Sequence, residues 1–223
     1  MTEPRLRHAI YLHGFASSAQ SSKAQYFRER FADVGITLHT PDFNTPDFES
    51  LTVTRMIGQT ELLVRSLPDG PVVLMGSSLG AFVTWHAAPR LAERVPSHPI
   101  SHLVLLAPAV TFGQDRQADF GPGVVDAWER DGEREIFHYG FNEPRRLRYD
   151  FYRDAVSYPS NPAAVTIPAL VFQGRRDEIV SPAGVQAFFA RQPTVTLQLV
   201  EDGHQLLQHL DVMWEQTRRF LGV

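Results

Sequence analysis

The chain has 223 residues, of which 43% are hydrophobic and 21% are charged, and its formal net charge is −4. This length suits one domain, residues 1–223, with a sizeable core and room for a small inserted subdomain. The composition excludes the basic footprint of a nucleic-acid-binding protein, and the absence of cysteine excludes disulfides, thiol catalysis and cysteine metal sites.

The predicted elements alternate between short apolar strands and longer helices. Several strands are nearly continuous apolar runs, which is typical of parallel strands buried on both faces. This alternation predicts an α/β fold with a mostly parallel sheet of about six or more strands and helices on both faces. We expect strands at His8–Leu12, Ile36–Thr40, Val72–Met75, Leu103–Leu106, Ala169–Phe172 and Thr196–Val200. We expect helices at Lys23–Val34, Phe48–Leu67, Leu79–Ala88, Gln186–Ala190 and Leu206–Phe220.

The interval between Ala109 and Pro168 interrupts this alternation, because it contains no convincing buried strand. A structureless loop of about 55 residues is rare in a compact domain. We therefore predict a small helical cap at about 110–166, laid over the ends of the strands. The alternative is a pair of ordinary helices packed on the sheet edge. The aromatic residues of this interval are Phe112, Phe120, Trp128, Phe137, Tyr139, Phe141, Tyr149, Phe151, Tyr152 and Tyr158.

A serine motif follows the strand Val72–Met75. The residues Gly76-Ser77-Ser78-Leu79-Gly80 match G-x-S-x-G, and the setting of strand before and helix after is that of a nucleophile elbow. Such a turn strains the serine so that its Oγ projects from the backbone, and glycines are needed because strand and helix pass very close together. Ser78 is the predicted nucleophile, whereas Ser77 occupies the variable position and is the weaker candidate.

An acid and a histidine follow the elbow in the order that this motif requires. Asp177 comes just after the strand Ala169–Phe172, and His204 comes just after Thr196–Val200. Both therefore lie at the carboxyl ends of strands, where ligands bind in open parallel sheets. An imidazole can take the proton of the serine, and a carboxylate can hold that imidazole in the correct tautomer. We expect His204 to act as general base and Asp177 to orient it.

Other polar residues compete with these candidates. Glu178 and Asp202 flank them and are the alternatives for the acid. His86 and His209 fall inside expected helices, where packing or surface roles are usual. The remaining histidines show no metal-ligand spacing, and an H-E-x-x-H pattern is absent. We expect no metal and no cofactor.

Two backbone amides are candidates for an oxyanion hole. One such donor comes from the residue after the nucleophile and the second from the loop after an earlier strand, which here nominates Leu79 and Phe15. Gly14 would let this loop approach a substrate closely, and His13 is expected to hold the loop by a hydrogen bond. We expect the substrate to contact Gly14, Phe15, Trp128 and Phe141.

These segments together resemble the small bacterial esterases of the YqiA/YcfP type within the α/β-hydrolases. The resemblance rests on the run Tyr11 to Ser18 with Ser21, Lys23 and Ala24, on the elbow, and on Asp202-Gly203-His204. The opening is also similar to that of the mitochondrial depalmitoylating thioesterases. The resemblance covers most of the chain and implies cleavage of a carboxylic ester or thioester. Independently of it, Ser17–Lys23 is either a polar loop that ends in a helix N-cap or part of the pocket rim.

The sequence thus predicts a serine hydrolase that cleaves small to medium carboxylic esters or thioesters through an acyl-enzyme. The alternatives are a depalmitoylase-like acyl-thioesterase, an amidase, a C–C hydrolase or, in another class, a non-catalytic binding module with the same fold. The start MTEPRLRHAI lacks an apolar signal core, and no stretch reaches the ~18 apolar residues of a membrane span, so a cytoplasmic location is expected. The natural substrate and the oligomeric state stay open.

Overall fold

A six-stranded parallel sheet forms the centre of the computed structural model, which describes residues 5–115, 119–159 and 165–223. The strand order is β2-β1-β3-β4-β7-β8, and every neighbouring pair is parallel. Each of the six predicted strands overlaps one of these, so the predicted sheet is confirmed. The strands are β1 His8–Leu12, β2 Thr37–His39, β3 Val72–Ser77, β4 Ile100–Leu106, β7 Ala169–Gly174 and β8 Val195–Val200.

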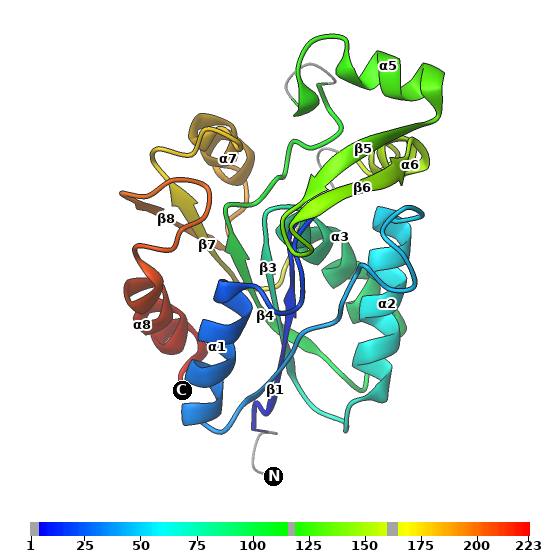
Figure 1. The fold of residues 1–223 in the computed structure, drawn as a ribbon. Coiled ribbons are helices and arrows are strands. Elements are labelled where there is room, and N and C mark those ends of the chain that lie inside the picture. Colours follow the sequence, from blue (N-terminus) through cyan, green and yellow to red (C-terminus); the bar gives the residue numbers. More distant parts are fainter. Residues whose placement is uncertain (1–4, 116–118, 160–164) are drawn as a thin grey trace.

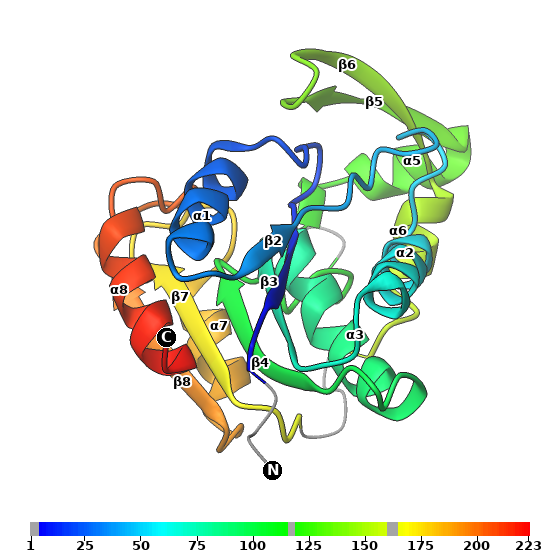
Figure 2. The same cartoon turned by 90° about the horizontal axis from the view of Figure 1, so that it is seen from below.

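Helices cover both faces of the sheet, because successive residues of a strand point to opposite sides. Ile10 and Leu12 belong to a core that includes α2, α3 and α7, whereas Ala9 and Tyr11 belong to a second core with α1 and α8. Figure 2 shows α1 and α8 on one side of the sheet and α2 and α3 on the other. Among the described helices, none has both the length and the apolar composition that a membrane crossing would require. Their bounds are α1 Ser22–Asp33, α2 Val53–Ser66, α3 Leu79–Arg94, α7 Pro182–Phe189 and α8 Leu210–Leu221.

Four helix boundaries differ from those predicted by four or more residues. α2 begins at Val53 and not at Phe48, and α7 begins at Pro182 and not at Gln186. α3 was expected to stop before Pro89, but it continues to Arg94. Proline removes one backbone N–H from the helix, and the burial of Leu91 in the core favours continuation. α8 begins four residues later than the predicted Leu206. The preceding residues form turns instead, because the Asp202 carboxylate accepts the backbone N–H of Gln208.

The cap segment contains strands as well as the expected helices. Its described elements are α5 (Val124–Asp131), β5 (Glu133–His138), β6 (Glu143–Arg148) and α6 (Asp150–Ala155), while 116–118 and 160–164 lie outside the described residues. β5 and β6 pair as an antiparallel hairpin, which we call the cap hairpin. The predicted helical cap is therefore corrected to a cap that contains a hairpin as well as helices. These strands gave no apolar alternation because β6 buries only its leucine. Figure 1 shows the cap at the end of the sheet where the strands finish.

Candidate active site

The chain makes a sharp turn between β3 and α3, and Ser78 lies at its apex. Ser78 has φ 54° and ψ −117°, a conformation that costs a non-glycine residue about 1–3 kcal/mol. A Cβ at Gly76 would lie 2.3 Å from the carbonyl oxygen of Gly80, and a Cβ at Gly80 would lie 2.0 Å from that of Leu12. Only glycine fits at both positions, and the strained turn between them is the elbow that the sequence predicts.

Ser78, His204 and Asp177 form one hydrogen-bonded chain. His204 Nε2 lies 3.1 Å from Ser78 Oγ, and His204 Nδ1 lies 2.9 Å from Asp177 Oδ2. Because an ionised carboxylate can only accept hydrogen bonds, Nδ1 carries the imidazole proton and Nε2 presents its lone pair to the serine hydroxyl. In this arrangement the imidazole can take the serine proton.

The carboxylate of Asp177 is buried and accepts hydrogen bonds on both oxygens. Oδ1 accepts the N–H groups of Ile179 and Val180 at 2.9 and 2.8 Å, and Oδ2 accepts Gln173 Nε2 at 2.9 Å in addition to His204. Burial opposes ionisation, but the hydrogen bonds from His204, Val180 and Ile179 outweigh it and hold the pKa of Asp177 below its ordinary value. The carboxylate is therefore charged and fixed in orientation.

The alternative acids make other contacts. In the described structure neither Asp202 nor Glu178 is hydrogen-bonded to His204. Asp202 Oδ2 accepts the Gln208 N–H at 2.9 Å and lies 3.3 Å from His209 Nδ1, and Glu178 is exposed. Asp202 thus folds the loop that carries His204 and does not contact the imidazole.

Two residues that position this site, Gln173 and Gly174, were missed by the sequence analysis. Gln173 is fully buried at the end of β7 and donates to the Asp177 carboxylate. A Cβ at Gly174 would lie 2.5 Å from the Asp202 carbonyl oxygen, so the missing side chain lets the loop of His204 approach the strand that leads to Asp177. The available signal was a glycine two residues after the predicted strand Ala169–Phe172, and nothing in the local pattern marks Gln173.

The two nominated oxyanion donors line the same cavity as Ser78. In the described part of the chain, neither the Leu79 N–H nor the Phe15 N–H donates an internal hydrogen bond. The Leu79 N–H is at the first turn of α3, where the helix dipole is positive. A Cβ at Gly14 would lie 3.2 Å from the carbonyl oxygen of Ser77, so the loop of Phe15 lies directly against the elbow. Both residues line the cavity that Ser78 also lines, so their amides stay candidates for oxyanion donors.

A cavity of about 1030 Å³ opens beside this hydrogen-bonded chain. Two aromatic residues expected to contact substrate do not line it. Trp128 is 1% exposed and donates its indole N–H to the Leu147 carbonyl at 3.0 Å. Phe141 stacks on His138 with ring centroids 4.2 Å apart. The aromatic side chains that line the cavity are Tyr11, Phe15, Phe112, Phe120, Phe137 and Tyr139.

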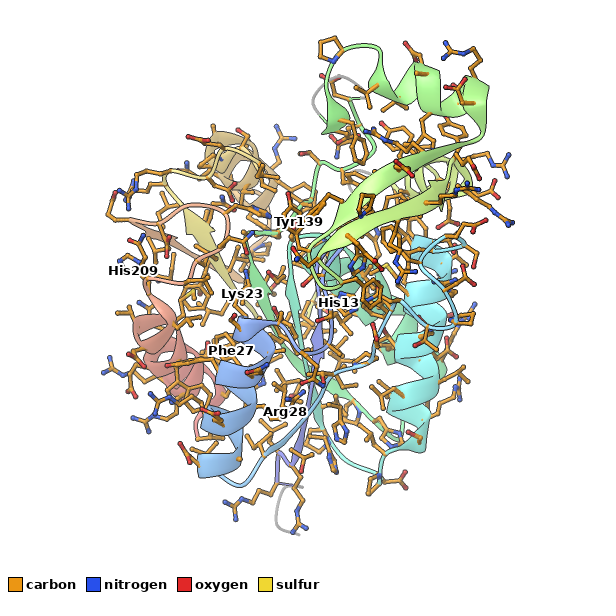
Figure 3. All side chains as sticks on the ribbon, in the orientation of Figure 1. His13, Lys23, Phe27, Arg28, Tyr139 and His209 are labelled. Carbon is orange, nitrogen blue, oxygen red and sulfur yellow. The ribbon has the colours of Figure 1, made fainter. Side chains whose placement is uncertain are left out.

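The stretch Ser17–Lys23 forms a polar part of the same cavity wall, and the two roles weighed for it coexist. Ser21 caps α1, and its neighbours line the cavity. Lys23, labelled at the upper end of α1 in Figure 3, donates from Nζ to the Gln205 carbonyl at 2.8 Å, beside the catalytic candidate His204. Burial lowers the pKa of Lys23 to about 8, although nearby carboxylates oppose the shift. Within the described ranges, no group of three or more potential ligands is arranged to hold a metal.

The fold is the α/β-hydrolase fold. The structure of alpha/beta hydrolase domain-containing protein 10 from mouse matches with a TM-score of 0.78 and 21% identity, covering 99% of this chain and 91% of that one. Est1E from Butyrivibrio proteoclasticus matches with a TM-score of 0.76 and 19% identity, covering 99% and 88%. At these identities the likeness is one of fold, and it confirms the predicted fold class.

The sequence also matches a family model. The family described as "Uncharacterised protein family (UPF0227)" matches residues 8–220, and this chain belongs to that family. Lipase LipV from Mycobacterium tuberculosis (strain ATCC 25618 / H37Rv) is 26% identical over 171 residues, which are 72% of this chain. The match spans 63% of the lipase's own length.

Proposed function

We propose that this protein is a serine esterase that cleaves carboxylic esters through an acyl-enzyme, with Ser78, His204 and Asp177 as its catalytic residues. The observation that carries the proposal is the continuous hydrogen-bonded chain from Ser78 Oγ through the imidazole to the buried carboxylate. Its position at a strained elbow, beside two unengaged amides, adds the second requirement of acyl transfer, which is a place for the oxyanion.

In the acylation step, Ser78 Oγ attacks the ester carbonyl carbon while His204 Nε2 takes the hydroxyl proton. The carbonyl oxygen becomes an oxyanion and accepts hydrogen bonds from the N–H groups of Phe15 and Leu79. Asp177 keeps the proton on Nδ1 and stabilises the imidazolium that forms. When the carbon–oxygen bond of the ester breaks, the imidazolium gives its proton to the departing alkoxide and the acyl-enzyme remains.

Deacylation repeats these events with water. His204 Nε2 takes a proton from water as its oxygen attacks the acyl carbon, and the same two amides stabilise the second oxyanion. The collapse of this intermediate returns the proton to Ser78 Oγ and releases the carboxylic acid. No group beyond these side chains and amides is required.

The substrate class follows from the cavity and from the relatives. The cavity has an aromatic wall and a polar wall, and its volume suits a small to medium ester. A lipase is among the relatives, which favours an ester over an amide. Thioesters would use the same residues, because a thiolate leaves without the strong protonation that an amine needs.

The test compares two adjacent serines. Ser78→Ala should lower kcat by at least roughly 10³, whereas Ser77→Ala should keep most of the activity. The reason is that triad residues act together, so the loss of one of them removes most of the catalysis that all three provide. A fluorophosphonate probe should label the wild type and Ser77→Ala but not Ser78→Ala. The substrates are p-nitrophenyl esters and acyl-thioesters of graded length. A wild-type protein that neither reacts with the probe nor turns over any of these would refute the proposal and favour a binding module.

A further inference from the structure

Residues 14–17 carry the Phe15 N–H, and we call them the oxyanion loop. Three contacts hold this loop. The first contact comes from His13, whose Nδ1 lies 2.9 Å from the Gly14 carbonyl oxygen while its Nε2 accepts the Phe43 N–H at 3.0 Å. Gly14 C=O and Phe15 N–H belong to the same peptide unit. Because that unit is planar, fixing the carbonyl also fixes the direction of the N–H.

Two further contacts hold the residues that follow Phe15. Ala16 has φ 51°, a left-handed conformation that a residue with a Cβ keeps only when its surroundings enforce it. Its carbonyl accepts the N–H of Gly140, which lies in the turn of the cap hairpin, at 3.2 Å. The next carbonyl, that of Ser17, accepts Asn44 Nδ2 at 2.9 Å. The strained segment is thus tied to the cap and to the loop after β2.

Asn44 is itself oriented by the cap hairpin. His138 Nε2 lies 2.9 Å from Asn44 Oδ1, and His138 Nδ1 accepts the Phe141 N–H at 3.2 Å, so the imidazole donates to the amide oxygen. The amide nitrogen of Asn44 therefore faces the Ser17 carbonyl and Asp42 Oδ1. His138 is fully buried and Asn44 is nearly so, which makes the orientation of this amide unambiguous.

The hairpin turn lies over the oxyanion loop in space. Figure 3 labels Tyr139 at the tip of the hairpin, above the part of the chain that contains His13. A Cβ at Gly140 would lie 3.0 Å from Ser18 Cβ and 3.1 Å from the Ser17 carbonyl carbon, so the two segments are in close contact there. Chain segments about a hundred residues apart therefore meet at the loop that supplies one oxyanion donor, as the separation of His138 and Asn44 by 94 residues shows.

We propose that Asn44 and the turn of the cap hairpin position the oxyanion loop, so that the cap contributes to the chemical step and not only to substrate binding. The inference rests on the proposed function. Asn44, His138 and Gly140 are positioning residues, because they act on the reaction through the Phe15 N–H. A misplacement of about 1 Å in such a donor can cost on the order of 10² in rate.

We call the hydrogen bonds of Asn44 and Gly140 to the oxyanion loop, together with that of His138 to Asn44, the clamp. Two variants perturb it in opposite ways. Asn44→Ala removes the donor to the Ser17 carbonyl, whereas Gly140→Ala removes nothing and adds a methyl group that pushes the turn off the loop. The control is Glu49→Gln, which breaks the 2.8 Å ion pair between Glu49 and Arg148 at the other end of the cap hairpin. The control therefore loosens the hairpin without touching the oxyanion loop.

The measurements are kcat per titrated active site, KM for a short acetate ester, and Ki for a boronic acid that mimics the tetrahedral intermediate. Asn44→Ala and Gly140→Ala should each lower kcat by roughly 10- to 100-fold and raise Ki by the same factor, with KM within about threefold of wild type. Glu49→Gln should stay within about twofold on all three.

The result that overturns the inference is a pair of clamp variants whose kcat and Ki match the wild type, even if their melting temperatures fall. A merely structural role would lower the fraction of active sites and the melting temperature and would leave Ki unchanged. A wild-type protein without turnover contradicts the proposed function and the inference together. Wild-type turnover that depends on Ser78, combined with unaffected clamp variants, contradicts the inference alone.

Discussion

Replacing Asp177 by asparagine tests the site most directly. The carboxylate accepts the Ile179 and Val180 N–H groups on Oδ1 and Gln173 Nε2 on Oδ2, and His204 Nδ1 lies 3.1 and 2.9 Å from the two oxygens. An amide has only one oxygen, so the donors on its other side must face the new NH₂ group. If the amide oxygen keeps the Ile179 and Val180 donors, the NH₂ group faces His204. The imidazole then presents Nδ1 as an acceptor, and its proton moves to Nε2.

That tautomer is the wrong one for catalysis. A protonated Nε2 cannot accept the hydroxyl proton of Ser78, so the general base is lost although the side chains stay in place. We expect kcat to fall by about 10⁴, which corresponds to about 5 kcal/mol of transition-state stabilisation. The loss of one hydrogen bond to a charged acceptor should also cost about 1.5–3 kcal/mol of stability.

The matched control is Asp202→Asn, since Asp202 is equally buried, lies in the neighbouring loop and also accepts backbone N–H bonds. Asp202→Asn should lower the free energy of unfolding about as much as Asp177→Asn does, but it should reduce kcat by less than about tenfold. The assay is p-nitrophenyl acetate hydrolysis per titrated active site, with urea unfolding of the same samples. If Asp202→Asn costs more rate than Asp177→Asn, the acid has been assigned to the wrong turn.

Three further predictions follow from the same structure. Gly174→Ala should destabilise the fold by about 1–3 kcal/mol and lower kcat, because its Cβ would enter the loop of His204, whereas Gly58→Ala, a helix position with open space around it, should be neutral or stabilising in urea unfolding. Burial lowers the pKa of Lys23 from 10.5 in the unfolded chain to about 8 in the folded protein, so the folded state binds this proton less tightly. The stability of the wild type relative to Lys23→Met should therefore rise with pH across that window, and a constant difference between pH 7 and 10 would contradict the shift. Phe120→Ala should raise KM selectively for long apolar esters, whereas Trp128→Ala should lower the melting temperature and affect all chain lengths alike; equal KM profiles would remove Phe120 from the substrate wall.

Local sequence patterns were sufficient to predict the strands of the sheet and the turn that carries Ser78. Runs such as Val72–Met75 are apolar because both faces of a central parallel strand are covered, and this leaves a signal in consecutive residues. The glycines at 76 and 80 mark a close approach between a strand and the helix that follows it, which is also a local event. The order in which Ser78, Asp177 and His204 follow their strands then placed them at one edge of the sheet, because parallel strands end on the same side.

Only the tertiary structure shows which residues of the cap line the cavity and which are buried away from it. Trp128 and Phe120 are both aromatic residues of the same interval, yet the first is buried inside the cap and the second lines the cavity. The strands of the cap hairpin carry mainly charged residues and leave no apolar pattern in the sequence. The backbone hydrogen bonds between the two strands define the hairpin, and these became visible only in the folded structure.

No sequence pattern predicts the clamp on the oxyanion loop either. Asn44 and Gly140 look like ordinary loop residues in sequence, and they acquire a role only when distant segments fold against the carbonyls of Ser17 and Ala16. Contacts of this kind are fixed by the directions of single hydrogen bonds between distant loops, which impose no periodicity or composition on the residues around them.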